Sequence, residues 1–229
     1  MANIEPTPPH VDPSNSRAKP VAFPPATANR LGLYLRELQH FSRSGVQTIK
    51  SHALGNRLGL SDSQIRRDLS LLGEHGRRGV GYNVAGLVGS LRKALGTDGM
   101  WNVILIGFGN LGNALARYRG FGEQGFVLQA VFDADIRKVG IPVAGVPVFH
   151  IDDLEAVIRS QPVQLAILAV PAESAPSIAE RLSSMGVSGI LNFSPVSLSN
   201  REKMAVVDVD LAIELQRLAF AVVNSEKSG

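Results

Sequence analysis

The segment WNVILIGFGNLG, residues 101–112, decides how the second half of this chain folds. Its first six residues form a short, continuous apolar run, which is typical of a strand buried on both faces of a parallel sheet. Its last six match G-x-G-x-x-G, a pattern that is informative where it follows a strand and opens a helix. Gly107 would allow a tight turn, Gly109 the close approach of a pyrophosphate, and Gly112 the packing of helix on strand. The predicted dinucleotide-binding residues are Gly107, Phe108, Gly109, Asn110, Leu111 and Gly112.

An acidic residue lies where such a site would need one. Asp133 ends the next strand-like run, VLQAVFD at residues 127–133, and comes 21 residues after Gly112. A carboxylate there can accept hydrogen bonds from the ribose hydroxyls of an adenosine, and it repels a 2′-phosphate. The sequence thus favours NADH and NAD+ over their 2′-phosphorylated forms, while a different adenine ligand, such as coenzyme A, stays open.

Strands and helices alternate beyond this point. The runs LAILAV (165–170) and SGILNF (188–193) repeat the buried-strand pattern, and a helical segment at 172–185 lies between them. Alternation of this kind predicts an α/β fold, with a Rossmann-like, doubly wound parallel sheet over residues 97–209.

The last helix is predicted to contact a second subunit. LAIELQRLAFAVV, at about 211–223, follows a final strand-like run and is apolar nearly all round. Such a helix should be buried, and in so small a domain a partner subunit is the expected place. We therefore assign residues 210–229 to a dimerisation helix.

Residues 26–96 have the helix pattern of a winged-helix, DNA-binding domain. A single apolar stripe predicts a helix over 27–42. A short helix through residue 58 follows, with Ser51 as its predicted N-cap. A further helix comes after a glycine-containing turn, and this order is that of a helix-turn-helix unit.

The second helix of this unit, over 62–72, is the predicted recognition helix. Ser61 would cap it, and Gln64 three residues later fits a capping box. The first turns of such a helix meet the base edges and phosphates of double-stranded DNA. Asp68 is expected to orient an arginine rather than to face DNA. The predicted DNA-binding residues on this helix are Ser61, Ser63, Gln64, Arg66 and Arg67.

A glycine- and arginine-rich stretch and the charge distribution support the same interpretation. GEHGRRGVGY, residues 73–82, predicts a tight hairpin, or wing, whose Arg77 and Arg78 would enter a minor groove. Residues 26–96 carry 11 Lys and Arg against 4 Asp and Glu, whereas residues 97–229 carry 10 against 14. A basic module joined to an acidic one indicates that the first meets a polyanion. The alternative is a protein-interaction module with a solvated basic face.

Composition sets further limits. The chain has no cysteine, which excludes disulfides, thiolate zinc sites and thiol-based redox sensing, so any redox response needs a bound cofactor. The histidines lack metal-ligand spacing, and no metal is predicted. No apolar run approaches the ~18–20 residues of a membrane span, and the N-terminus lacks a secretory signal, so we expect no membrane partner and a cytoplasmic protein. Residues 1–25 are proline-rich and are expected to form a disordered tail.

Taken together, these residues resemble the Rex family of redox-sensing transcriptional repressors over about 26–223. The resemblance is specific because a winged helix, a dinucleotide pattern and the segments that connect them occur in the family's order. The segments that carry it are IRRDLSLLGEHGRRGVGYNV (65–84), WNVILIGFGNLG (101–112), FDADIRKVG (132–140), GVPVFHIDDL (145–154), VPAESA (170–175) and GILNFSPV (189–196).

The resemblance implies a homodimer that binds inverted-repeat operator DNA when NADH is low and closes on NADH to release it. NAD+ would compete for the same site without triggering release. The C-terminal helix would be exchanged between subunits.

The resemblance also implies roles for residues that the patterns alone leave unassigned. Val170 and Pro171 would join the cofactor site, and Tyr118 would lie near the nicotinamide. Arg36 and Asp210 would form an ion pair in one state, replaced by a contact between Tyr118 and Asp210 in the other. From the residues alone, Tyr118 would be a packing residue, Arg36 a solvated charge and Asp210 a helix N-cap.

The sequence departs from the family pattern in two places, and other functions compete. Leu71, Leu72 and His75 stand where the family usually has aromatic residues, and Phe108 is bulky for its position. An NAD-dependent oxidoreductase with a basic appendage would need a general acid or base near the nicotinamide. His150 is the one histidine of residues 97–229, with no recognisable catalytic arrangement around it. A coenzyme A-responsive regulator is the second competing function.

Overall fold

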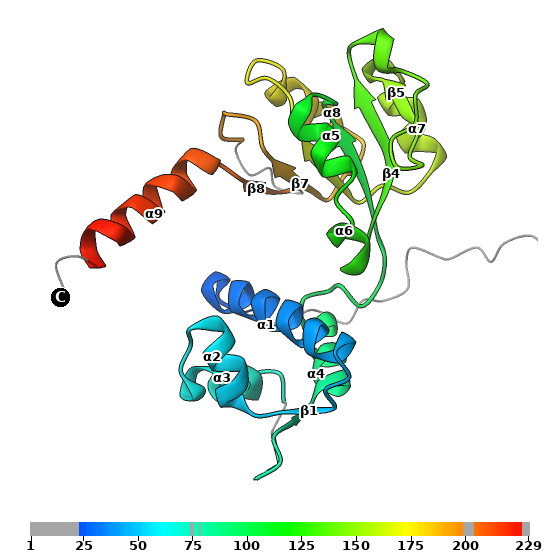
Figure 1. Ribbon diagram of the computed structural model, residues 1–229. Coiled ribbons are helices and arrows are strands. Elements are labelled where there is room, and N and C mark those ends of the chain that lie inside the picture. Colours follow the sequence, from blue (N-terminus) through cyan, green and yellow to red (C-terminus); the bar gives the residue numbers. More distant parts are fainter. Residues whose placement is uncertain (1–22, 74–75, 78, 199–203, 226–229) are drawn as a thin grey trace, which may run out of the picture. The chain divides into compact units, whose positions relative to one another are not determined.

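The chain forms two compact units, Met1–Asp98 and Gly99–Gly229, each with a hydrophobic core of its own (Figure 1). The computed structural model describes residues 23–73, 76–77, 79–198 and 204–225. The predicted tail therefore lies almost wholly outside the described residues, as does Arg78 of the predicted wing.

The first unit is a small helical domain with a two-stranded antiparallel sheet. Its elements are α1 (Pro25–Arg43), β1 (Thr48–Ile49), α2 (Ser51–Leu58), α3 (Asp62–Ser70), β2 (Tyr82–Asn83) and α4 (Val84–Ala94). Every helix contributes to the core, whose buried residues include Leu31, Tyr34, Leu38, Leu54, Ile65, Leu69, Leu87 and Leu91. The predicted stripe of the first helix is thus the face that α1 buries.

The start of α3 is confirmed in part. The Ser61 hydroxyl accepts a hydrogen bond from the Gln64 amide at 3.3 Å, so Ser61 is the N-cap. The reciprocal half of the capping box is wrong, because the Gln64 side chain donates to the Asp68 carboxylate at 2.9 Å. The helix also ends at Ser70, two residues earlier than predicted.

The predicted cap of α2 is wrong. The helix begins at Ser51 itself, and Lys50 occupies the N-cap position without a side-chain cap. The reason is a competing partner, since the Ser51 hydroxyl accepts a hydrogen bond from Arg66 of α3 at 3.0 Å.

The second unit is built on a six-stranded sheet in the order β5-β4-β3-β6-β7-β8, with every neighbouring pair parallel. The strands are β3 (Trp101–Ile106), β4 (Phe126–Asp133), β5 (Val148–His150), β6 (Leu165–Leu168), β7 (Gly189–Asn192) and β8 (Ala205–Asp208). The strand order reverses between β3 and β6. In sheets of this kind, ligands bind at the carboxyl ends of the strands beside that reversal.

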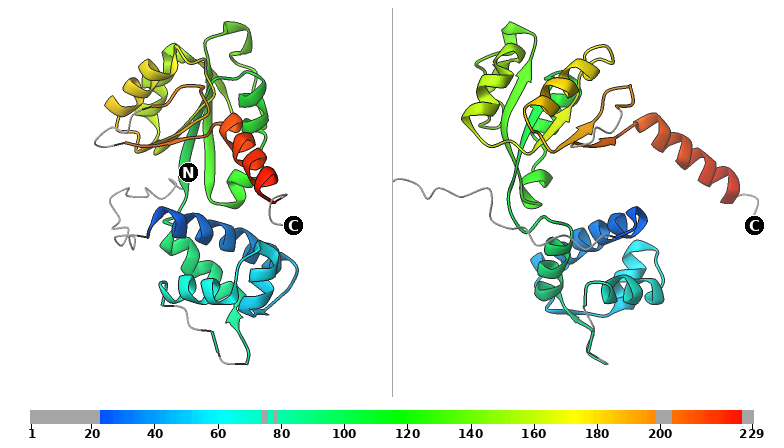
Figure 2. Two further views of the ribbon diagram at one scale, coloured as in Figure 1. Left: turned by 90° about the vertical axis from the view of Figure 1, so that its left-hand side faces the viewer. Right: turned by 180° about the vertical axis from the view of Figure 1, so that it is seen from behind.

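Helices cover both faces of this sheet (Figure 2). These helices are α5 (Asn110–Ala116), α6 (Gly120–Glu123), α7 (Leu154–Ser160) and α8 (Ala175–Ser184), with short 3₁₀ turns at Ile136–Lys138 and Ile151–Asp153; the last helix, α9 (Leu211–Ser225), follows β8. Ile104 and Ile106 of β3 face the cluster that contains α7 and α8, whereas Val103 and Leu105 face the cluster of α5 and α6. This alternation is that of a strand buried on both faces.

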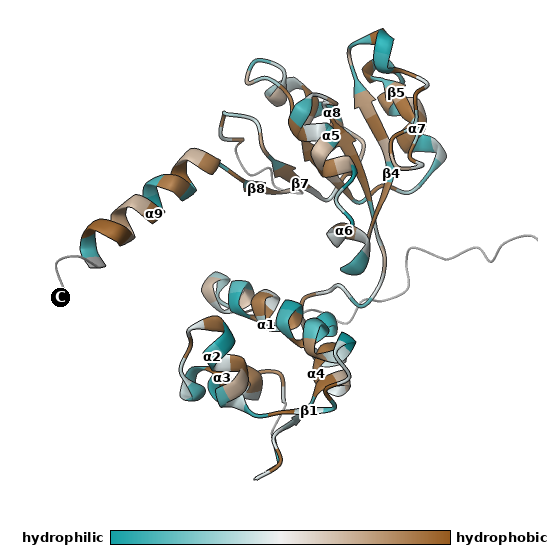
Figure 3. Ribbon diagram, in the orientation of Figure 1, coloured by the Kyte–Doolittle hydropathy of each residue, from teal (hydrophilic) through white to brown (hydrophobic). Residues whose placement is uncertain are grey.

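The helix α9 is the exception to burial. Every residue from Leu211 to Asn224 is exposed, and hydrophobic residues lie along its length (Figure 3). Within one chain, this helix is therefore not buried as the sequence led us to expect. Among the described residues, no helix combines the length and the apolar character that crossing a bilayer requires.

Candidate nucleotide and DNA sites

The predicted glycine turn lies at the reversal of strand order. Gly107 follows β3 with φ of 96°, a left-handed conformation that favours glycine. A β-carbon on Gly107 would collide with the carbonyl oxygen of Ala169, which follows β6, and one on Gly112 would collide with the carbonyl oxygen of Gly107. The space beside Gly109 is open. The turn therefore has the tight, open-faced form that a pyrophosphate needs.

The loop after β6 lies against this turn. The Ala169 amide donates to the Ile106 carbonyl at 2.8 Å, and a Val170 methyl lies 2.9 Å from where a Gly107 β-carbon would be. Val170 and the following Pro171 thus come next to the glycine turn although they are more than 60 residues away in sequence. The structure brings these predicted residues together.

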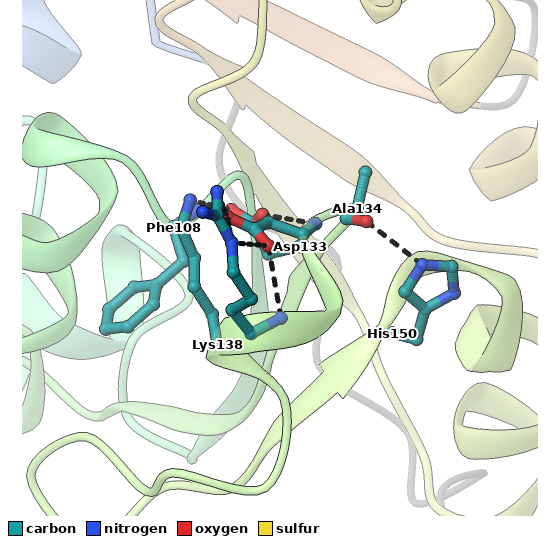
Figure 4. Close-up of polar contacts among 7 residues, drawn as sticks. Phe108, Asp133, Ala134, Lys138 and His150 are labelled. Atoms are coloured by element: carbon teal, nitrogen blue, oxygen red, sulfur yellow. Dashed lines mark hydrogen bonds and ion pairs between the residues drawn. The ribbon is translucent and has the colours of Figure 1, made fainter.

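Asp133 ends β4 and holds its carboxylate beside the turn (Figure 4). Its Oδ2 accepts hydrogen bonds from the Phe108 amide at 2.6 Å and from the Lys138 ammonium at 3.0 Å. Its Oδ1 accepts from the Asp135 amide at 2.8 Å, which leaves capacity for one more donor, such as a ribose hydroxyl. Burial raises the pKa of Asp133, but the hydrogen bonds from Asp135, Phe108 and Lys138 outweigh burial and hold the pKa below its usual value. The group is therefore an anion at neutral pH.

Lys138 contacts the candidate site through Asp133 and was not predicted from the sequence. It lies in the 3₁₀ turn Ile136–Lys138, five residues beyond Asp133, where no pattern marks it. Its ammonium offsets part of the carboxylate's charge, which weakens the argument that Asp133 alone repels a 2′-phosphate. The bulk of Phe108 is accommodated, because its ring packs on the apolar cluster of the sheet face.

Ser194 is a second residue that the sequence did not mark. It follows β7 at the same edge of the sheet, is 7% exposed, and its hydroxyl has no hydrogen-bond partner among the described residues. Only the fold brings the end of β7 to this edge.

The residues of the expected switch have local partners in the single chain. Tyr118 is 61% exposed and lies edge-to-face on Phe121, with ring centroids 5.1 Å apart. The Asp210 carboxylate accepts hydrogen bonds from the amides of Ala212 and Ile213, so it caps α9. Arg36, in the first unit, is exposed and lies 3.7 Å from Glu37. These are the roles expected from the residues alone, and the predicted exchange of partners stays a prediction.

In the first unit, the predicted wing closes as a hairpin at its described positions. Arg77 and Gly81 exchange two backbone hydrogen bonds of 2.8 Å each. A groove of about 340 Å³ lies between this hairpin and the helix-turn-helix unit. It is lined by Lys50, Ser51, His52, Arg66, Gly76, Arg77, Gly79, Gly81 and Tyr82. Of these nine residues, Arg66 and Arg77 were predicted to bind DNA, and the other seven were not.

The predicted residues of α3 fall into two groups. Ser61, Ser63, Arg66 and Arg67 are exposed, and Arg66 lines the groove. Gln64 is half-buried and donates to Asp68, so it lies at the edge of the exposed face. Within the part of the chain that the structure describes, no group of three or more His, Asp or Glu is placed to hold a metal ion.

Two family models match the chain, one in each unit. The model described as "Putative DNA-binding protein N-terminus" covers residues 22–70, and the model described as "CoA binding domain" covers residues 98–196.

Several solved structures and sequences are similar to nearly the whole chain. The crystal structure of RSP in complex with β-NAD+ and operator DNA has a TM-score of 0.81 and 34% identity, covering 90% of this chain and 95% of that one. RSP in complex with β-NADH has a TM-score of 0.79 and 33% identity, covering 90% and 97%.

Proteins called redox-sensing transcriptional repressor Rex are more similar in sequence. That of Carboxydothermus hydrogenoformans is 44% identical over 87% of this chain and 96% of its own length. That of Rhodopirellula baltica is 48% identical over 85% of this chain and 82% of its own length. Identity of this level, together with the glycine turn, the Asp133 carboxylate and the basic winged helix, shows that the chain belongs to the Rex family of redox-sensing transcriptional repressors.

Proposed function

We propose that this chain is a transcriptional repressor that binds operator DNA through its first unit and senses the NADH/NAD+ ratio through its second. The observation that carries the proposal is the match over 90% of the chain to RSP, a Rex-family repressor crystallised with β-NAD+ and operator DNA. The basic groove beside α3 supports the DNA partner, and the glycine turn beside Asp133 supports the nucleotide. The direct test is release of an operator duplex by NADH.

The nucleotide-binding residues fit NADH and NAD+. The turn at Gly107 has no room for a β-carbon, and Asp133 keeps an acceptor for a ribose hydroxyl. Coenzyme A is the second candidate ligand, because a family model named for coenzyme A binding matches residues 98–196. We expect NADH fluorescence to show binding that a large excess of coenzyme A does not displace. Displacement at equal concentrations would favour the coenzyme A-responsive regulator.

Two apolar surfaces of the second unit support a homodimer in which α9 is exchanged. One surface is α9, where Leu211, Leu215, Leu218 and Phe220 are each at least 60% exposed. The other is an apolar pocket of about 250 Å³ on the sheet, lined mainly by β3, β4, β6, β7 and β8 with Phe121 of α6. Exposed apolar surface of this extent marks an interaction site. The occupant that we propose is α9 of a second copy, because it is the long apolar helix that one chain leaves uncovered.

Release of DNA follows from linkage between the two sites. A nucleotide displaces DNA only if it binds the closed dimer more tightly than the DNA-competent dimer. Oxidised nicotinamide is a cation and reduced nicotinamide is neutral, so closure that excludes water favours NADH. Phe121 contacts Tyr118 and also lines the apolar pocket. A movement of the partner's helix in that pocket as the dimer closes would therefore change the packing of the Tyr118 ring.

Regulation, rather than catalysis, is the proposed role of nucleotide binding. His150 is the one histidine of the second unit, and both its ring nitrogens are engaged: Nε2 lies 3.1 Å from the Ala134 carbonyl and Nδ1 lies 3.2 Å from Asp152. A histidine held this way supports the turn after β4. We expect no NADH oxidation with small carbonyl compounds, and turnover that is lost in His150→Ala would favour the oxidoreductase.

Replacing Arg66 or Arg67 by alanine should weaken operator binding by about 1–3 kcal/mol, because a bidentate arginine–guanine pair contributes that much discrimination. The measurement is fluorescence anisotropy on operator and on random duplex at fixed salt. Arg57→Ala is the matched control, since it removes the same charge from a guanidinium that pairs with Glu37. Equal losses on both duplexes would assign the arginine to a phosphate instead of a base.

Tyr118→Phe should leave operator binding unchanged and raise the NADH concentration needed for release, if the hydroxyl contacts Asp210 in the closed state. The substitution keeps the ring and its packing on Phe121, so it removes the hydroxyl alone. Anisotropy of the bound duplex during NADH addition measures the effect. Release at the wild-type NADH concentration would exclude an essential role for the hydroxyl.

A further inference from the structure

Asp68 is a buried carboxylate that joins the predicted recognition helix α3 to α1. Its side chain is 2% exposed. Oδ2 accepts hydrogen bonds from Arg30 Nε and the Tyr34 hydroxyl, both at 2.7 Å. Oδ1 accepts from Arg30 Nη2 and Gln64 Nε2, both at 2.9 Å. Each oxygen therefore receives two donors, which uses the full acceptor capacity of a carboxylate.

The network keeps its charges in the folded domain. Burial raises the pKa of Asp68, but the hydrogen bonds from Arg30, Tyr34 and Gln64 outweigh burial and hold the pKa below its usual value. The hydrogen bond to Asp68 raises the pKa of Arg30. Burial, followed by the contact with Asp68, raises the pKa of Tyr34, so its hydroxyl stays protonated and donates.

Stability alone is a weak reason for such a network. Replacing a buried ion pair by well-packed apolar residues is often neutral or stabilising, and the core around Asp68 is already apolar. Hydrogen bonds differ from apolar contacts in having a direction, so the three that Arg30 and Tyr34 of α1 donate to one carboxylate fix how α3 is turned against α1.

The rotation of α3 about its axis decides where its arginines point. At about 100° per residue, Arg67 and Arg66 lie roughly 100° and 160° round the helix from Asp68. Both are exposed, whereas Ile65, Asp68 and Leu69 are buried. A rotation of 10° moves groups at the helix surface by roughly 1 Å. A shift of that size is enough to weaken a bidentate pair with a base edge, because hydrogen bonds fall off steeply with distance and angle.

We propose that Asp68 is a positioning residue for DNA readout, which holds α3 against Arg30 and Tyr34 of α1 so that Arg66 and Arg67 meet the bases in register. The proposal rests on the proposed function, because it needs α3 to be the DNA-reading helix. It assigns Gln64 to the support of Asp68, through the hydrogen bond that its amide donates.

The test compares two variants with a matched control. Asp68→Asn keeps the shape of the side chain and replaces one acceptor by a donor that faces Arg30 or Tyr34. Tyr34→Phe removes one of the four donors and keeps the ring. Glu155→Gln disrupts another bidentate arginine–carboxylate pair, in the second unit, where Arg181 lies 2.7 and 2.8 Å from the two carboxylate oxygens. Each protein is measured at a temperature at which circular dichroism shows it fully folded.

We expect Asp68→Asn to lower operator affinity by about 5- to 150-fold, the range that loss of one bidentate arginine–base pair implies. Affinity for random duplex, which depends on charge, should change less than about two-fold. Tyr34→Phe should change operator affinity in the same direction by a smaller factor. Affinity for NADH should be unchanged in both, and Glu155→Gln should lower the thermal midpoint without changing the ratio of operator to random affinity.

Two results would overturn the proposal in distinguishable ways. If Asp68→Asn and Tyr34→Phe both lose thermal stability but keep the wild-type ratio of operator to random affinity, Asp68 is a structural residue only. If Asp68→Asn fails to fold, Tyr34→Phe decides alone by the same ratio. If the wild type itself shows no preference for operator over random duplex, the proposed function fails and the positioning role fails with it.

Discussion

Replacing Leu218 and Phe220 by aspartate should convert the dimer into monomers and remove high-affinity operator binding. Both side chains are largely exposed on α9 in the single chain, at 60% and 73%, and would be buried in the exchanged arrangement. Burial of a large apolar side chain contributes about 1.5–3 kcal/mol, so the four side chains of a dimer contribute about 6–12 kcal/mol before the added cost of burying charge. A monomer contacts one half-site, and losing the second contact lowers the affinity by about 10²- to 10⁴-fold.

Sedimentation velocity and operator anisotropy measure the two effects on the same samples. The matched control is Gln216→Glu with Asn224→Asp, which adds the same charge to α9 at polar positions. We expect the control to stay a dimer and the Leu218/Phe220 variant to keep its circular dichroism spectrum, since Leu211–Asn224 of α9 are all exposed in the single chain. A variant that remains a dimer with full operator affinity would show that α9 is not the dimer contact.

Asp133→Ala should weaken binding of NADH and NAD+ together, by about 1–3 kcal/mol, or about 5- to 150-fold. The change removes the acceptor offered to the ribose and leaves the Phe108 amide and the Lys138 ammonium without their partner. It should also reduce discrimination against NADPH, because the anion is gone and the Lys138 cation remains beside the ribose position. Titration by nucleotide fluorescence and calorimetry measures all three affinities.

The neighbouring Asp135 supplies a control for this change. Its carboxylate pairs with Arg137 at the surface, so Asp135→Ala removes an equal charge two residues away. We expect its NADH affinity to stay within about two-fold of the wild type, the size of effect that a screened surface charge has. Unchanged nucleotide affinity in Asp133→Ala would falsify the assignment of Asp133 to the ribose.

The glycine turn and the carboxylate beside it were predictable because their signal is local. A tight turn needs glycine at Gly107, close helix packing needs it at Gly112, and the parallel strand order carries Asp133 to the same edge. The strands were predictable for a related reason, since strands buried on both faces are continuous apolar runs. The Ser61 cap was readable from the residue type and its distance to the helix.

Contacts between residues that are distant in the chain could not be predicted from the sequence. Asp68 was expected to orient an arginine, but nothing in the spacing identifies Arg30, 38 residues away. The predicted cap at Ser51 was wrong for the same reason, because its hydroxyl accepts a hydrogen bond from Arg66 of another helix. For α9, the apolar pattern predicted the helix, but Leu211–Asn224 are all exposed in one chain, so what would bury them depends on a second copy.

The central claim is that one dimer couples the nicotinamide redox state to operator binding. The most direct measurement is anisotropy of an inverted-repeat duplex titrated with the protein alone, with NADH and with NAD+, at fixed salt. We predict specific binding that NADH relieves and that NAD+ alone does not, with NAD+ raising the NADH concentration needed for release. Specific binding that is indifferent to NADH would contradict the claim.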